Sequence, residues 1–192
     1  SHIFKELSYI YCGNYKGDYI AFQRLNNGKL AYNLKDNQTN GLMADYRFDK
    51  TGNAINIDNT TYDPRLRPWY QIALKAGKAR WTNIYPFIGS KGTNQPGMSF
   101  VYPYYNKAGT LLGVLGSDFT LNRISDFLRS MKIGKTGKTF IVERSGLLVG
   151  GSFPYASFDE NIKRLKAHDV KDPLIQATVK YLVNQYKDFS KI

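Results

Sequence analysis

One short segment combines positive charge, aromatic surface and a stiff backbone: residues 62–70, Tyr-Asp-Pro-Arg-Leu-Arg-Pro-Trp-Tyr. Pro68 is expected in the first turn of a helix, where its missing N–H costs no hydrogen bond, and Gly77 is expected as the C-cap of that helix. Arg67, Trp69 and Tyr70 would then lie at a helix N-terminus. That end of a helix favours an anion, and the planar guanidinium of Arg67 matches a carboxylate. The segment is therefore predicted to bind a small carboxylate.

Asp118 is the candidate for the opposite charge. It follows small residues, Gly113, Gly116 and Ser117, at which a backbone or a ligand can approach closely. An unpaired buried charge costs several kcal/mol, so a pocket must match each charge of its ligand. Arg67 alone would reject an α-amino group, and Asp118 alone would reject a carboxylate. The two residues together favour a zwitterion.

Each of these residues also has a purely structural interpretation. Arg67 can form an ion pair with Asp63 or Asp118 instead of holding a ligand. Asp118 can serve as a helix N-cap just before Thr120. The aromatic residues of the pattern can simply pack in the core: Trp69, Tyr70 and Tyr85.

The composition predicts a globular, β-rich protein. An apolar fraction of 42% with 15% aromatic residues supports a hydrophobic core, and the 15 tyrosines indicate aromatic pairs across strands. The net charge of +12 is scattered among acidic residues without a basic run, which argues against nucleic acid as a partner.

The same composition offers little for catalysis or metal binding. The single cysteine, Cys12, excludes an intrachain disulfide, and His2 and His168 lie too far apart for a helix-spaced metal pair. No nucleophile, phosphate-binding loop or catalytic triad is evident. We therefore expect neither an enzyme nor a cofactor. No apolar run approaches the ~18 residues that a membrane-spanning helix needs.

The hydrophobic pattern predicts an α+β fold in which one curved antiparallel sheet carries flanking helices. A helix is expected over residues 3–12, and a polar loop over 89–97 is long enough to be a lid. The expected strands are 18–25, 29–34, 42–48, 54–57, 80–87, 98–105 and 110–119. After them come a helix over 120–131, a glycine-punctuated linker over 132–138, a hairpin over 139–151 and a helix that begins at Asp172 and Pro173.

The order of Tyr62, the Arg67–Tyr70 corner, Tyr85 and Asp118 resembles the double-Cache sensor domains of bacterial receptors. The linker 133–137 and the strand 140–142 extend that resemblance over nearly the whole chain. It implies a PAS-like Cache fold without catalytic activity. It also implies three parts: a ligand-binding membrane-distal lobe (1–120), a connecting helix and linker (121–138) and a partial membrane-proximal lobe (139–192).

The six aromatic and charged positions are similar to the amino-acid-binding signature of that family. The resemblance implies that Arg67 and Trp69 hold the α-carboxylate and that Tyr85 assists there. Asp118, with Tyr62 and Tyr70, would hold the α-ammonium. The expected ligand is an L-amino acid or a close analogue.

The resemblance also implies a cellular setting. The domain would face the periplasm or the extracellular space from the cell membrane, connected to transmembrane helices and a cytoplasmic output domain. A second copy of the chain, in a homodimer, is a further implied partner. Two other hypotheses stay open at this point: the same fold binding an amine, a purine or an organic acid, and a basic nucleic-acid or glycan-binding module.

Overall fold

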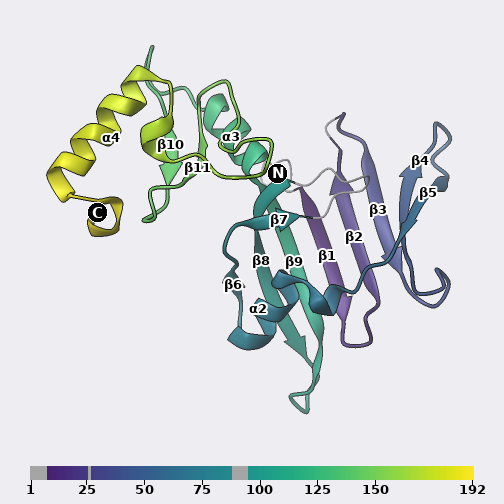
Figure 1. Cartoon of the computed structure of the whole chain (residues 1–192). Helices are drawn as coiled ribbons and strands as arrows, with labels where there is room; N and C mark the ends of the chain where they lie inside the picture. The colour runs from purple at the N-terminus through teal and green to yellow at the C-terminus, as the bar shows by residue number, and fades with distance from the viewer. Residues whose placement is uncertain (1–7, 26, 88–94) are drawn as a thin grey trace. The chain divides into compact units, whose positions relative to one another are not determined.

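The computed structural model describes residues 8–25, 27–87 and 95–192, which belong to two compact units, Ser1–Phe119 and Thr120–Ile192 (Figure 1). Parts of three predicted segments lie outside the described residues. They are the start of the helix expected over 3–12, most of the loop expected over 89–97, and residue 26, which lies between the strands expected over 18–25 and 29–34.

The first unit is built on an antiparallel sheet in the order β5-β4-β3-β2-β1-β9-β8-β6, with β7 also paired to β8. Strands β1 to β5 follow one another in the chain, and β1 also pairs with β9 from much later in the sequence. The strands are β1 (Tyr9–Asn14), β2 (Tyr19–Arg24), β3 (Leu30–Lys35), β4 (Met43–Phe48), β5 (Ala54–Thr60), β6 (Arg80–Trp81), β7 (Tyr85–Phe87), β8 (Gln95–Tyr105) and β9 (Leu111–Thr120).

The helix predicted over residues 3–12 is wrong for residues 9–12, which form part of β1. Their apolar side chains fit a period of two as well as a helical period, a common ambiguity of short runs. Tyr9 and Tyr11 point to one face of the sheet, and Ile10 and Cys12 point to the other. Because β1 pairs on both sides, its backbone hydrogen bonds are made across the sheet instead of within a helix.

The strand predicted over 80–87 is instead two short strands, β6 and β7, both paired with β8. The side chain of Thr82 interrupts the ladder, because its Oγ1 accepts the hydrogen bond of the Ser99 backbone N–H at 2.9 Å. The other predicted strands are present, with ends shifted by a few residues.

Between β5 and helix α2 (Pro68–Ala76) the chain crosses one face of the sheet. β5 lies at one edge, whereas α2 packs against β8 toward the other edge. The crossing includes a short 3-10 helix, η1 (Pro64–Leu66), which contacts β1. The predicted helix start at Pro68 and the C-cap at Gly77, with φ of 62°, are confirmed.

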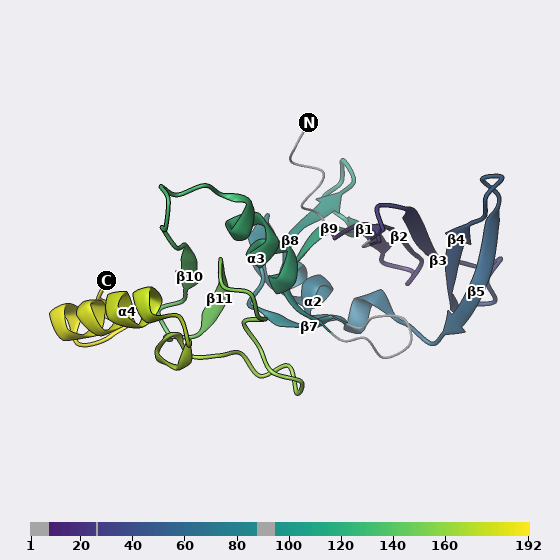
Figure 2. The same ribbon diagram turned by 90° about the horizontal axis from the view of Figure 1, so that it is seen from above.

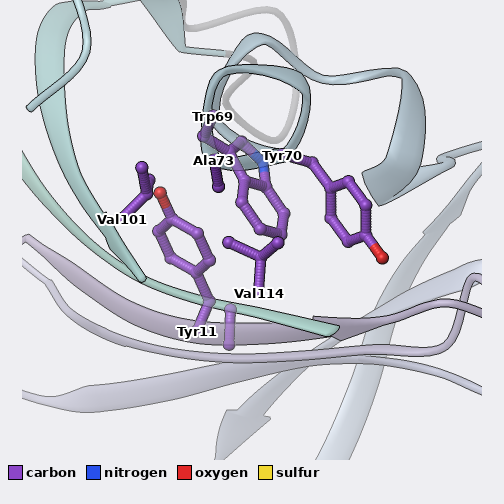
Figure 3. Close-up of a cluster of buried hydrophobic side chains, with 7 residues drawn as sticks. Tyr11, Trp69, Tyr70, Ala73, Val101 and Val114 are labelled. Atoms are coloured by element: carbon purple, nitrogen blue, oxygen red, sulfur yellow. The ribbon is translucent and has the colours of Figure 1, made fainter. Parts of the chain in front are cut away.

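Side chains from α2 pack onto the sheet and form the core of the first unit (Figure 3). The rings of Trp69 and Tyr11 meet edge to face, with centroids 4.7 Å apart. Gly116 lies against the ring of Tyr11, and a Cβ at this position would collide with it. The core residues are Tyr11, Ala21, Trp69, Tyr70, Ala73, Val101 and Val114.

The second unit combines a two-stranded sheet with two helices, and α3 packs against β11. Thr120 caps α3 by accepting a hydrogen bond from the backbone N–H of Arg123. Asp172 caps α4, and Pro173 occupies its first turn, as predicted. The elements are α3 (Leu121–Ser130), β10 (Phe140–Val142), β11 (Leu148–Gly151), η3 (Ala167–Asp169), α4 (Pro173–Tyr186) and η4 (Phe189–Lys191).

Gly116→Ala should destabilise the first unit by about 1–3 kcal/mol, because the added methyl group displaces the ring of Tyr11 from a packed core. Both tryptophans of the chain, Trp69 and Trp81, belong to this unit. Urea unfolding followed by tryptophan fluorescence therefore reports its stability. Ser117→Ala is the control, since Ser117 points to the opposite face of the same strand. Equal unfolding midpoints for the two variants would contradict the packing role of Gly116.

Candidate functional site

A cavity of about 130 Å³ lies in the first unit, between one face of the sheet and the crossing segment. The sheet curves from β9 round to β5, as the view from above shows (Figure 2). Cross-strand register places one lining side chain after another on this face. The cavity is lined by Tyr9, Tyr11, Tyr19, Gln23, Asn33, Met43, Asp45, Asp58, Thr60, Thr61, Tyr62, Arg67, Trp69, Tyr85, Phe87 and Asp118.

Asp118 supplies a buried carboxylate near the end of β9, where its side chain is aimed at the cavity. Its Oδ1 accepts hydrogen bonds from the hydroxyls of Tyr11 and Ser99, each at 2.6 Å. Its Oδ2 accepts none from the described residues. Among the described residues, every fully buried side-chain nitrogen or oxygen has a hydrogen-bond partner. Because Oδ2 has none, it is not fully buried and is open to the cavity.

Burial raises the pKa of Asp118 to about 7, against the lowering effect of the Ser99 and Tyr11 hydroxyls and of the Arg67 charge. The carboxyl group therefore changes charge near neutral pH. A cation that enters the cavity beside Oδ2 would favour the ionised form, so ligand binding and deprotonation of Asp118 are coupled.

Tyr85 belongs to the same network. Its hydroxyl lies 2.8 Å from Ser99 Oγ, and the single hydroxyl proton of Ser99 is donated to Asp118. Tyr85 must therefore donate to Ser99, which leaves its own oxygen as an acceptor. The family resemblance implied that Tyr85 assists in binding the α-carboxylate of the ligand. The structure instead connects its hydroxyl to the anionic side of the cavity.

Arg67 supplies the cation at the junction between η1 and α2. Its guanidinium lines the cavity and forms no ion pair or side-chain hydrogen bond with any residue that the structure describes. Asp63 pairs with Arg65 at 2.7 Å instead of with Arg67. The two structural interpretations of Arg67, an ion pair with Asp63 or with Asp118, are therefore both absent among the described contacts.

Trp69 both packs in the core and lines the cavity. Its indole N–H donates to the hydroxyl of Tyr62 at 3.3 Å, and the ring of Tyr62 lies against Tyr19 with centroids 4.9 Å apart. Because its indole N–H is already hydrogen-bonded to Tyr62, Trp69 contributes an apolar surface to the cavity and positions Tyr62 over the sheet.

Tyr70 does not reach the cavity. It is 2% exposed, and its ring packs edge to face against Trp69 on the side of α2 that turns away from Tyr11 (Figure 3). The packing interpretation of Tyr70 therefore describes its place better than the ammonium contact that the resemblance implied. The interpretation of Asp118 as a helix N-cap is not supported either, because Thr120 caps α3.

Sequence reasoning missed several residues that the fold brings to the site. Tyr9 and Tyr11 were assigned to a helix, and reading them as alternate residues of a strand would have placed both on one face. Ser99 carries no local signal and becomes functional only through its contact with Asp118. Among the described residues, no group of three or more metal-binding side chains is present.

Comparison with known proteins identifies the fold family. The sequence profile of the family dCache_1, described as a Cache domain, matches residues 17–187. The chain belongs to the Cache domain family. A Cache sensor domain is a non-catalytic ligand-binding module, and its α+β architecture agrees with the large antiparallel sheet described above.

The Cache domain is similar over part of its length to curated chemotaxis proteins. The methyl-accepting chemotaxis protein McpA of Pseudomonas putida is 34% identical over 89 residues, which are 46% of this chain and 13% of McpA. The methyl-accepting chemotaxis protein McpB of Bacillus subtilis is 32% identical over 84 residues, or 44% of this chain and 12% of McpB. The chain thus matches only a small part of these relatives.

Solved structures share the fold at low identity. The ligand-binding domain of the amino acid chemoreceptor PctB of Pseudomonas aeruginosa with L-Gln aligns over 87% of this chain and 52% of that one, with 21% identity and a TM-score of 0.47. The ligand-binding domain of the chemoreceptor CtaA of Pseudomonas fluorescens with L-isoleucine aligns over 88% of this chain and 52% of that one, with 19% identity and a TM-score of 0.46. The structure of a protein named Methyl-accepting Chemotaxis protein X aligns over 95% of this chain and 61% of that one, with 17% identity and a TM-score of 0.50.

Cache domains of methyl-accepting chemotaxis proteins lie outside the cytoplasm. Among the described helices of this Cache domain, none has the length and apolar character required to cross a membrane.

The raised pKa of Asp118 predicts a pH-dependent stability. The folded pKa of about 7 exceeds the unfolded value of about 3.9, so the folded state binds the proton more tightly, and the free energy of unfolding falls as pH rises from 4 to 7. Asp118→Asn removes this pH-dependent loss of stability, because the asparagine side chain does not ionise. Relative to wild type, the variant should gain on the order of 2–4 kcal/mol between pH 4 and pH 8.

The measurement is urea unfolding of both proteins at several pH values, followed by tryptophan fluorescence. Glu160→Gln serves as the control, because Glu160 is an exposed acid of the second unit. A constant difference between Asp118→Asn and wild type across this range would show that Asp118 titrates normally.

Proposed function

We propose that residues 1–120 form a ligand-binding lobe that recognises an L-amino acid or a close analogue. One observation supports the proposal most directly. The guanidinium of Arg67 and the carboxylate of Asp118 line the same cavity, yet no ion pair joins them. A zwitterion placed between them satisfies both charges at once, with its carboxylate at Arg67 and its ammonium at Asp118 Oδ2.

The surrounding groups complete the recognition of the ammonium. Tyr85 offers a hydroxyl oxygen as an acceptor, and Oδ2 of Asp118 offers a second one. Tyr62 and Trp69 line the part of the cavity next to Arg67. Burial of these aromatic residues excludes water, which strengthens the contact between each charge and its partner.

The size of the cavity fits a small ligand. Its volume of about 130 Å³ is close to the ~150 Å³ of an engineered cavity that accommodates benzene. A ligand of roughly ten heavy atoms reaches a binding free energy of roughly −5 to −8 kcal/mol, which corresponds to micromolar to submillimolar affinity. Such affinity suits a sensor of ambient metabolites.

In this proposal the Cache domain is the extracytoplasmic sensor of a bacterial transmembrane receptor, such as a chemoreceptor, a histidine kinase or a cyclase. The partial similarity to methyl-accepting chemotaxis proteins favours the first of these. Residues 121–138 would connect the ligand-binding lobe to a membrane-proximal lobe, of which 139–192 are a part.

Thermal unfolding with the twenty L-amino acids tests the proposal. At a ligand concentration of 100 times Kd, stability rises by about 2.7 kcal/mol, which raises Tm by roughly 5–10 °C for a chain of this size. Arg67→Gln and Asp118→Asn should each abolish the rise. Arg65→Gln is the matched control, because Arg65 pairs with Asp63 and does not line the cavity.

Ligands that carry one charge separate this function from its alternatives. Propionate lacks the ammonium of L-alanine, and ethylamine lacks its carboxylate, so each leaves one protein charge unpaired. Stabilisation by one-charge ligands of either kind, without any response to amino acids, would refute the zwitterion site. Strongly salt-dependent retention on an oligonucleotide without that response would indicate a nucleic-acid-binding module.

Ligand affinity should increase with pH up to about 8. Asp118 must be ionised to hold an ammonium, and its pKa of about 7 leaves only roughly a tenth of the protein ionised at pH 6. For a neutral zwitterion identified by the thermal screen, calorimetry should give a Kd several-fold higher at pH 6 than at pH 8. A Kd that is constant from pH 6 to pH 8 would argue against an ammonium contact at Asp118.

A further inference from the structure

The cavity has a second polar region at the end away from Asp118. Asn33 on β3 lies directly opposite Asp45 on β4, and Asp45 lies opposite Asp58 on β5. All three line the cavity together with Arg67 and Asp118. Like charges directly opposite each other on neighbouring strands are unfavourable, so this arrangement calls for a compensating positive charge.

The protein supplies only part of that charge. Arg47 forms an ion pair with Asp45, with Nη2 of the arginine 3.0 Å from Oδ2 of the aspartate. Asp58 has no ion pair within the described residues, and its carboxylate accepts a hydrogen bond from the backbone N–H of Asn59. Once Arg67 and Asp118 have bound a zwitterion, Asp58 therefore keeps a negative charge that none of the described residues compensates.

Asn33 is an independent sign that a polar group belongs here. It is 8% exposed and faces the cavity, and its amide makes no hydrogen bond with any described residue. Because no fully buried polar side-chain atom of the described residues lacks a partner, this amide is open to the cavity and available to a polar ligand group. A ligand group that both donates hydrogen bonds and carries positive charge would satisfy Asn33 and Asp58 together.

Geometry requires the ligand side chain to be long. Asp118 is on β9 and Asp45 is on β4, four strand spacings away, which is roughly 19 Å along the sheet at the usual strand spacing. The curvature of the sheet shortens this path (Figure 2), and so do the side chains that line the cavity. A short side chain such as that of alanine still cannot cross it.

We infer that the cavity selects an amino acid whose long side chain ends in a cation, such as a guanidinium or ammonium group, held by Asn33 and Asp58. This inference rests on the amino-acid-binding function proposed above. Asp58 is then a specificity-determining residue, whereas Arg67 and Asp118 bind the part that all amino acids share.

L-arginine and L-citrulline provide a sharp test, because citrulline has nearly the same shape and lacks the side-chain charge. Calorimetry at pH 8, where Asp118 is ionised, should show L-arginine binding roughly tenfold more tightly or better, as expected for hydrogen bonds to a charged group. Asp58→Asn should reduce this ratio to near one while citrulline still binds. Glu160→Gln removes an exposed negative charge of the second unit and should leave the ratio unchanged.

The outcomes separate this inference from the function on which it depends. Equal affinity for L-arginine and L-citrulline in the wild type would overturn the inference and leave amino-acid binding intact. A preference for L-arginine that persists in Asp58→Asn would also overturn the role of Asp58. If no amino acid binds and none raises Tm, the proposed function itself fails.

Discussion

The separation of two opposite charges is the constraint on which the site depends. The hydroxyls of Tyr11 and Ser99 occupy one oxygen of Asp118, which stabilises the buried carboxylate without neutralising it. A direct ion pair with Arg67 would satisfy both groups and leave nothing for a ligand to bind. Hydroxyl groups solve this problem because they donate hydrogen bonds and carry no charge. The free energy lost by burying Asp118 is then partly recovered when a cation binds.

The sheet and the crossing segment hold the two charges apart. Asp118 lies on the interior strand β9, while Arg67 lies on the chain segment that crosses over the sheet. Pro64 and Pro68 restrict the backbone of this passage, and the packing of Trp69 on Tyr11 attaches it to the sheet. Movement of α2 would therefore change the distance between the charges. The geometry of recognition depends on the hydrophobic core directly beneath it.

Several tyrosines line the cavity, and they stay neutral at physiological pH. Burial raises the pKa of Tyr9 to about 12 and holds the pKa values of Tyr11 and Tyr19 well above the usual value of this side chain. All three keep their protons at physiological pH and act as donors or acceptors without adding charge. The electrostatic character of the cavity is thus set by four residues: Arg67, Asp118, Asp45 and Asp58. Of these, the last two lie at the end of the cavity where a ligand side chain would point.

Local rules were sufficient to predict some parts of the structure from the sequence. The proline restricts φ and lacks an N–H, and glycine tolerates positive φ, so the start of α2 at Pro68 and its end at Gly77 were predicted correctly. The charged pair Arg67 and Asp118 was recognised as complementary in chemistry. Other features follow from tertiary contacts. Residues 9–12 became a strand because β2 and β9 supplied partners, and Tyr70 turned into the core. Cross-strand register brought Ser99 to Asp118 and Asp58 to the cavity. These outcomes depend on contacts between residues far apart in the chain, which no local pattern encodes.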